Sequence, residues 1–102
     1  LEPYPDWSGY QTLSFDIYSP LDTSFSIRNR IEDFTHDGSL LDRFNRTLHL
    51  NPGENHFAIA ISDITLAPQS REMDMLEIAA IHFFGVDLRQ YDTLYFDNIR
   101  LQ

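Results

Sequence analysis

Apolar and polar residues alternate along most of this chain, and that period of two restricts the possible fold more than any other feature of the sequence. In the stretch TLSFDIYS, residues 12–19, one side carries Leu13, Phe15 and Ile17, and the other side is mostly polar. The same pattern recurs in three further segments, residues 25–33, 43–50 and 56–61. Because successive side chains of a β-strand point to opposite faces of a sheet, each segment predicts a strand with one buried and one solvated face.

The rest of the chain also indicates short strands. IAAIHFF, residues 78–84, is apolar at almost every position, which predicts a strand covered on both faces. TLYFDNIRL, residues 93–101, begins in alternation and then shifts phase, so we expect a β-bulge near Asp97 and Asn98. SREMDMLEI, residues 70–78, predicts the one short helix. About six short strands separated by turn sequences such as NPGEN predict an all-β fold, an antiparallel β-sandwich.

Charge and composition exclude several classes of protein. The formal net charge is −9 over 102 residues, so duplex nucleic acid and an anionic membrane surface are not expected partners. No apolar run approaches the roughly 20 residues that span a bilayer, so we expect no direct membrane insertion of this domain. The absence of cysteine excludes disulfides and a cysteine nucleophile. A chain of this length that begins at Leu1 predicts a single β-sandwich domain, residues 1–102, within a longer protein.

The alternating segments on either side of residues 35–41 predict their own pairing. If the two segments run antiparallel, placing Ile31 opposite Phe44 brings the apolar residues of both to one face. A shift by one position would move every apolar side chain of one segment to the wet side, so this register is strongly favoured. The same register sets Glu32 across from Arg43 on the wet face, where opposite charges attract.

The chain has seven cationic side chains of lysine or arginine type, and every one of them is arginine. In the predicted register, Arg28, Arg30 and Arg43 form a row on the wet face. A guanidinium group offers a planar fork of donors that matches a carboxylate better than an ammonium group does. Two interpretations stay open: a solvated lattice of salt bridges, or the floor of a binding face that hydrogen-bonds the hydroxyls or carboxylates of a ligand.

Arg46 differs from this row, because the register places it on the apolar side, opposite Asn29. An unpaired buried charge is strongly destabilising, so an inward arginine needs acceptors. We expect Arg46 to brace the sandwich through a polar network that includes Asn29 and one carboxylate. The two carboxylates that could supply it are Asp33 and Asp16.

Two places could hold a metal ion. The stretch EDFTHD gathers carboxylates and an imidazole, but Asp and Gly are equally typical of an exposed turn, and we favour the turn. Asp97, at the expected bulge, could join backbone carbonyls around calcium or make an ordinary cross-strand hydrogen bond. The four histidines have no serine or aspartate beside them in a nucleophile pattern, so the sequence does not predict an enzyme.

The aromatic residues near the start of the chain allow two interpretations. Trp7, with Tyr4 and Tyr10, could stack on a sugar ring. A tryptophan just before a strand is more often a core anchor, and we favour that interpretation. His82 lies among apolar neighbours, which predicts a histidine of the core.

Three stretches together resemble the carbohydrate-binding-module-like domains of bacteria, which are jelly-roll sandwiches with the galactose-binding-like fold. The stretches are DWSGYQTLSFDIYSP, DRFNRTLHLNPGENHFAIAISDI and DTLYFDNIRL, in the same order as in that class. The resemblance implies a module without catalytic activity, on the extracytoplasmic side of bacteria, tethered to other domains of a parent protein. It also implies that the opening strands of the fold are missing upstream of PDWSGY.

In domains of this kind a glycan lies on the concave face of one sheet, and a structural calcium often lies near the terminal strands. Carried over to this sequence, the glycan would contact Tyr18, Arg28, Arg30, Arg43, Asn45 and His49. Asp97 would hold the calcium. Because this face is rich in arginine and poor in aromatic residues, we expect an acidic glycan as ligand. The alternative is a structural or protein-interaction domain that kept the scaffold and binds no sugar.

Overall fold

The computed structural model of the chain consists mainly of strands and describes residues 5–35, 37, 39–85 and 95–102. In chain order the elements are β1 (Thr12–Ser19), β2 (Phe25–Asp33), the 3₁₀ turn η1 (Leu40–Asp42), β3 (Phe44–Leu50), β4 (Gly53–Ala60), α1 (Ile61–Thr65), β5 (Ile78–Gly85) and β6 (Tyr95–Leu101). Each strand overlaps a segment for which the residue pattern predicted a strand, although β4 begins three residues earlier than predicted, at Gly53 within the stretch NPGEN.

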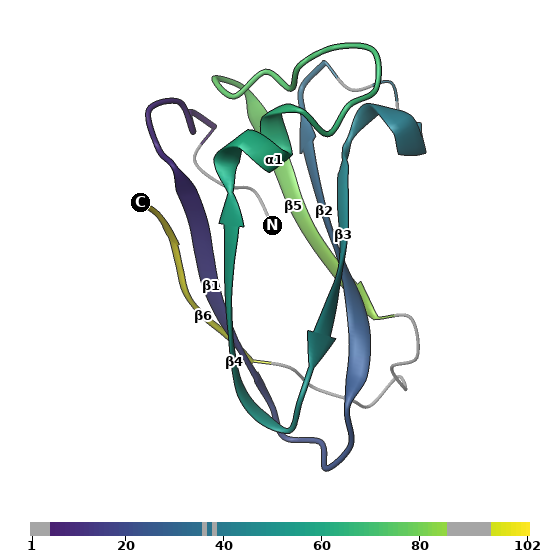
Figure 1. The fold of residues 1–102 in the computed structure, drawn as a ribbon, viewed down its shortest axis with the longest axis vertical. Coiled ribbons are helices and arrows are strands. Elements are labelled where there is room, and N and C mark those ends of the chain that lie inside the picture. The colour runs from purple at the N-terminus through teal and green to yellow at the C-terminus, as the bar shows by residue number, and fades with distance from the viewer. Residues whose placement is uncertain (1–4, 36, 38, 86–94) are drawn as a thin grey trace.

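The strands form two antiparallel sheets that pack face to face (Figure 1). Sheet A has the strand order β4-β1-β6, and sheet B has the strand order β3-β2-β5. β1 and β2 are the central strands, and every connection between consecutive strands crosses from one sheet to the other except that from β2 to β3. This arrangement confirms the predicted antiparallel β-sandwich.

The pairing of β2 with β3 has the register that the sequence predicted. Ile31 lies opposite Phe44, and Arg30 lies opposite Asn45. β5 pairs with the other side of β2, with His82 opposite Arg30. Ile27, Asn29 and Ile31 of β2 are buried and face sheet A, and the arginines between them face away from it.

The core lies between the inner faces of the two sheets. Phe83 of β5 reaches across it, and its ring centroid lies 5.2 Å from that of Phe15 and 4.7 Å from that of Phe96. Aromatic rings at such distances attract each other beyond the effect of buried area alone. Trp7 is also buried, and its backbone N–H donates to the Met75 carbonyl over 2.7 Å. Trp7 is thus the core anchor that we expected.

β6 contains the predicted bulge. Ser14 of β1 pairs with Arg100, but two residues further along β1 Asp16 pairs with Asp97, so β6 has one extra residue over this stretch. Asn98 in the bulge has a φ of 53°, in the left-handed region that asparagine tolerates better than most side chains. The extra residue leaves Asp97 and Arg100 on the same outer face of sheet A.

The α-helix lies elsewhere than the sequence predicted. Most of residues 70–78 form an irregular connection that leads into β5, so the prediction of a helix there is wrong. The α-helix is α1, in which Ile61 and Ile64 are buried three positions apart. Tertiary contacts hold the 70–78 segment in its irregular path: the Met73 side chain is buried, and its backbone N–H donates to the Thr65 carbonyl over 2.8 Å.

The prediction that residues 78–84 are covered on both faces is only partly right. Ile78 and Ile81 are buried, while His82 is half-buried and Phe84 is exposed. β5 is an edge strand of sheet B, and its outer side chains lie level with the arginines of β2. His82 is therefore not the core histidine that the sequence predicted.

Candidate ligand-binding face

The outer face of sheet B carries the row of arginines. Alternation on β2 turns Arg28 and Arg30 away from the core, and the register of β3 brings Asn45 and His49 to the same side. We call this surface the arginine face; its described residues are Ser26, Arg28, Arg30, Glu32, Arg43, Asn45, Thr47, His49, His82 and Phe84. Five of the six residues predicted to contact a glycan therefore lie on one surface.

Glu32 holds two guanidinium groups of the arginine face together. Its Oε1 lies 2.9 Å from Arg30 Nε and 3.4 Å from Arg43 Nη1. The Arg30 Nε–H group does not point at the Glu32 oxygen, so this contact is an ion pair and not a hydrogen bond. The buried Nε–H groups of Arg30 and Arg43 both lack a hydrogen-bond acceptor among the described residues. The predicted ion pair of Glu32 with Arg43 is confirmed, and two donors of the face remain unmatched.

Arg28 and His49 add accessible polar groups to the arginine face. Arg28 is exposed, and its side chain makes no hydrogen bond or ion pair with another described residue. His49 Nδ1 lies 3.2 Å from Ser26 Oγ. Arg30 Cζ lies 5.3 Å from the centre of the exposed Phe84 ring, which is a cation–π distance. The face thus combines accessible donors with the surface of an aromatic ring.

His82 lies beside Arg30 and contributes hydrogen bonding to the face. Burial lowers the pKa of His82, and the positive charge of Arg30 lowers it further, so the imidazole is neutral at neutral pH. Its Nε2 lies 3.9 Å from Glu32 Oε2. Because a neutral imidazole has one donor and one acceptor, His82 adds hydrogen-bonding capacity rather than charge.

Tyr18 does not belong to the arginine face, so its assignment to one surface with the arginines is wrong. It lies on β1 in sheet A, exposed beside Tyr95, with 6.1 Å between the two ring centroids. The outer faces of the two sheets point away from each other, so one flat ligand surface cannot include both Tyr18 and the arginines. The alternation of apolar and polar residues correctly predicted that Tyr18 lies on a solvent-exposed face. The alternation cannot predict which of the two sheets a strand joins.

Arg46 does not form the inward network that the sequence predicted. β3 is an edge strand, so the Arg46 side chain turns around the edge of the sandwich, stays 39% exposed and pairs with Asp63 at 3.2 Å. Its guanidinium carbon lies 5.2 Å from the centre of the Phe44 ring. Asn29, across from Arg46, is fully buried and donates from Nδ2 to the His82 carbonyl over 3.2 Å.

The bracing role that the sequence assigned to Arg46 belongs to Arg71. Asp33, at the end of β2, is fully buried, and its two carboxylate oxygens accept from Arg71 at 2.6 Å and 2.8 Å. The Arg71 Nε–H donates to Asp42 over 2.8 Å, and the Asp74 backbone N–H donates to Asp33 over 2.8 Å. We call Arg71, Asp33 and Asp42 the Arg71 clamp; it joins the end of β2, the turn before β3 and the segment before β5.

The Arg71 clamp is ionised at neutral pH. Burial by itself would raise the pKa of Asp33, but the hydrogen bonds from Arg71 and from the Asp74 backbone outweigh it, and the pKa is lowered. The hydrogen bond from Arg71 also lowers the pKa of Asp42. One sequence signal pointed to this cluster: Asp33 ends a strand next to buried positions and needs a cation. Its partner lies 38 residues away and follows no local pattern.

Two carboxylates of the EDFTHD stretch form ion pairs with arginines in the described structure. Its Glu32 belongs to the arginine face and its Asp33 to the Arg71 clamp, while His36 lies outside the described residues. Asp97 lies at the bulge, and its Oδ1 accepts from the Asn98 backbone N–H over 2.8 Å. In the described part of the chain, no three His, Asp or Glu side chains gather to hold a metal ion. The predicted calcium at Asp97, whose other ligands would be backbone carbonyls, stays a prediction.

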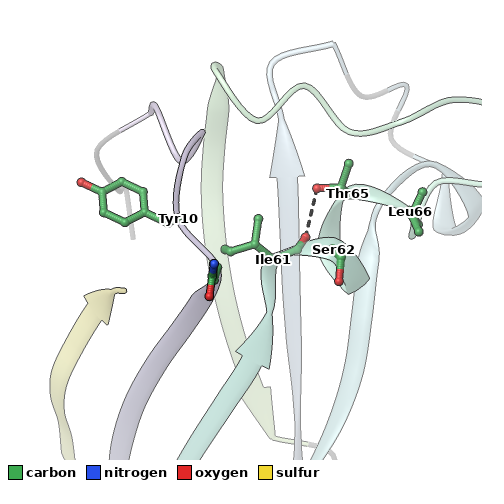
Figure 2. Close-up of a pocket in the computed structure, with 6 residues that line it drawn as sticks. Tyr10, Ile61, Ser62, Thr65 and Leu66 are labelled. Carbon is green, nitrogen blue, oxygen red and sulfur yellow. Dashed lines mark hydrogen bonds between the residues drawn. The ribbon is translucent and has the colours of Figure 1, made fainter.

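Two hollows differ in their position relative to the arginine face. One, of about 470 Å³, lies beside α1, with Tyr10 at one end, Leu66 at the other and Ile61 between them (Figure 2). The Thr65 hydroxyl on its wall donates to the Ile61 carbonyl over 3.0 Å. The other, of about 370 Å³, lies between β5 and β6 beside Phe83, and it is also lined by His82 of the arginine face. Among the described residues, no predicted ligand contact lines either hollow, so the candidate site is an open face.

Comparisons with known proteins give this chain no relative. No family model, no curated protein and no solved structure matches it. Within the described ranges, no helix is long and apolar enough to cross a membrane. The resemblance to carbohydrate-binding modules therefore rests on the three sequence stretches, together with an all-β sandwich that is compatible with it.

Proposed function

We propose that this domain is a non-catalytic carbohydrate-binding module of an extracytoplasmic bacterial protein, and that its arginine face holds an acidic glycan. The charge of that face carries the proposal. In a chain of net charge −9, the described residues of the face include three arginines and only one carboxylate, Glu32, which contacts two of them. Such a local excess of positive charge attracts an anionic ligand to this face, while the rest of the domain repels it.

The contacts of Glu32 support a carboxylate as the group that the face recognises. One oxygen of Glu32 lies within 3.4 Å of nitrogens of both Arg30 and Arg43. A guanidinium group binds a carboxylate or a sulfate through two parallel N–H donors. Arg28 faces the same side, and no described residue uses its donors, so a uronic acid could bind there without displacing Glu32.

The neighbours of the arginines support a sugar rather than a simple anion. Asn45 lies directly across from Arg30, and His49 lies on the same face of the adjacent strand. Amide and imidazole groups both donate and accept hydrogen bonds, which suits the hydroxyls of a sugar. Glycoside hydrolysis generally needs two carboxyl groups that flank the scissile bond, whereas Glu32 is already engaged with arginines. The face is therefore better suited to binding than to catalysis.

Titration calorimetry with a uronic-acid tetrasaccharide tests the proposal. We expect the acidic ligand to bind and its affinity to fall as the salt concentration rises, because salt screens exposed charges. Arg28→Ala should weaken this binding about tenfold, as expected for one charge-assisted contact. Arg46→Ala is the matched control, since it removes an arginine at the edge of the sandwich, and it should leave the affinity unchanged. Absence of binding, or equal effects of the two substitutions, would overturn the proposal.

A structural or protein-interaction function has one observation in its favour. Four large apolar side chains are exposed outside the strands, those of Phe34, Leu41, Leu66 and Leu76, and backbone hydrogen bonds join Phe34 to Glu77 and Leu41 to Gln69. Exposed apolar groups gathered in one region often mark a protein contact. If this were the function, Arg28→Ala and Arg43→Ala would lower the stability of the domain, and no glycan would bind.

A further inference from the structure

The outer face of sheet A differs in composition from the arginine face. Its central part has two successive rows across the three strands, Glu54, Tyr18 and Tyr95 in the first row and His56, Asp16 and Asp97 in the second. We call this surface the tyrosine face. The two rows are about 7 Å apart, which is the repeat of two residues along a strand.

Tyr18 and Tyr95 form an exposed aromatic platform on the tyrosine face. Their ring centroids lie 6.1 Å apart, and the two residues are 45% and 56% exposed. Neither hydroxyl makes a hydrogen bond with another described residue. A cross-strand aromatic pair stabilises a sheet only slightly. Two adjacent exposed rings also provide a surface on which a ligand with an apolar side can lie.

The second row places donors and acceptors beside this platform. Asp16 accepts from the Asn98 side chain over 2.8 Å and lies 2.6 Å from His56 Nδ1, so these contacts fix its orientation. Asp97 uses Oδ1 to accept from the Asn98 backbone, and its Oδ2 has no hydrogen-bond partner among the described residues. The bulge at Asn98 thus holds one free carboxylate oxygen next to the aromatic rings.

We propose that the tyrosine face binds a neutral sugar ring, with the flat side of the ring on the two tyrosines and its hydroxyls on Asp97 and His56. A pyranose has both features, since carbon-bound hydrogens cover its flat sides and hydroxyls surround its rim. The charges of the face favour a neutral ligand. Asp97 and Glu54 would repel an anionic sugar. A cationic ligand is not strongly attracted either, because Arg100 and His56 offset part of the negative charge of the face.

This second site goes beyond the proposed function and does not depend on it. The two outer faces point in opposite directions, because the sheets pack through their inner faces (Figure 1). One sandwich would therefore hold an acidic chain on one side and a neutral chain on the other. Loss of one activity would leave the other intact, which makes the two proposals separable.

NMR titration of the ¹⁵N-labelled domain with the neutral sugars cellotetraose and mannotetraose tests the inference. We expect backbone signals of the tyrosine face to shift, and Tyr95→Ala to weaken binding about tenfold. Tyr95→Phe is the matched control, because it keeps the ring and removes only the hydroxyl, and it should keep the affinity within about threefold. Arg28→Ala, on the opposite face, should leave binding of the neutral sugar unchanged.

The spectrum of each variant shows whether it is folded. If Tyr95→Ala did not fold, Asp97→Ala would test the polar row in its place, and it should also weaken the binding. The inference is overturned if neither sugar shifts any signal, or if the shifts fall on the arginine face. It is also overturned if folded Tyr95→Ala binds as well as the parent. A failure of these neutral ligands leaves the titration with the acidic tetrasaccharide unaffected.

Discussion

The Arg71 clamp and the arginine face place the same type of side chain in opposite situations. In the clamp, Arg71 makes two hydrogen bonds to the buried Asp33 and two to Asp42. On the arginine face, two arginines share Glu32, and Arg28 has no partner among the described residues. The protein itself satisfies the first guanidinium group and leaves donors of the others unmatched.

This difference separates structural arginines from those available to a ligand. A guanidinium group has five N–H donors, and a group whose donors are bound by the protein has none left for recognition. Net charge and the number of arginines do not distinguish the two cases. The number of acceptors within reach of each guanidinium group does distinguish structural arginines from those available to a ligand. This number is high for Arg71, at the Asp33 end of β2, and low for Arg28, towards the other end.

Arg71→Ala should have the largest effect on the domain. The substitution leaves the Asp33 carboxylate buried without a cation, and removal of one partner of a buried ion pair costs about 3–5 kcal/mol. This is a large part of the about 5–15 kcal/mol that separates a folded domain from its unfolded state. Urea unfolding followed by fluorescence of the buried Trp7 measures the loss.

Arg46→Ala is the control for that experiment, because Arg46 also pairs with a carboxylate but does so at the surface. The side chains of Arg46 and Asp63 are 39% and 54% exposed. Exposed ion pairs contribute about 0–1 kcal/mol, so the free energy of unfolding should fall by no more than that. Equal losses for Arg46→Ala and Arg71→Ala would contradict the distinction between the two kinds of arginine.

Glu32→Gln should shift the arginine face further toward ligand binding. The substitution keeps the size of the side chain but removes the charge that now holds Arg30 and Arg43. We expect a uronic-acid tetrasaccharide to bind several-fold more tightly, and the free energy of unfolding to fall by about 1–3 kcal/mol. Calorimetry compares the variant with the parent. Weaker binding by folded Glu32→Gln would mean that Glu32 orients the arginines for the ligand instead of competing with it.

His56→Gln should have the smallest effect, and that effect should depend on pH. The hydrogen bond and charge of Asp16 raise the pKa of His56 above its ordinary 6.5. The protonated histidine therefore stabilises the fold fully below pH 6.5, and this contribution is lost as the pH rises through the raised pKa. Urea midpoints measured from about pH 5 to pH 9 should fall on the alkaline side in the parent and stay flatter in the variant.

The Arg71 clamp should not contribute to that alkaline change. The pKa of Asp33 is lowered from its ordinary 3.8, so the stability that it contributes is present above pH 3.8 and is lost only as the pH falls below that value. An alkaline loss of stability that persisted unchanged in His56→Gln would contradict the assignment to the pair of His56 and Asp16.

The strands, one register and the bulge could be predicted because each depends on local pattern. Only one alignment of β2 and β3 buries the apolar residues of both, and it sets Ile31 opposite Phe44. The same alignment gave five residues of the arginine face. The phase shift in TLYFDNIRL likewise located the bulge, and Asn98 there adopts the positive φ.

Features that depend on the third dimension could not be predicted in this way. The pattern gave Tyr18 a wet face, but the assignment of β1 to sheet A decides which face it is. The register gave Arg46 an inward position, but an edge strand lets a long side chain turn back to solvent. Asp33 needed a cation, and the fold supplies one from an irregular segment that the sequence predicted as helix.

The most direct test compares the arginine side chains within one sample. In the ¹⁵N-labelled domain, the Nε–Hε signal of each arginine reports on its own guanidinium group during addition of a uronic-acid tetrasaccharide. The account predicts that the signals of Arg28, Arg30 and Arg43 shift as the ligand binds, while the signal of Arg71 stays in place. A shift of Arg71 with no change at Arg28 would contradict it.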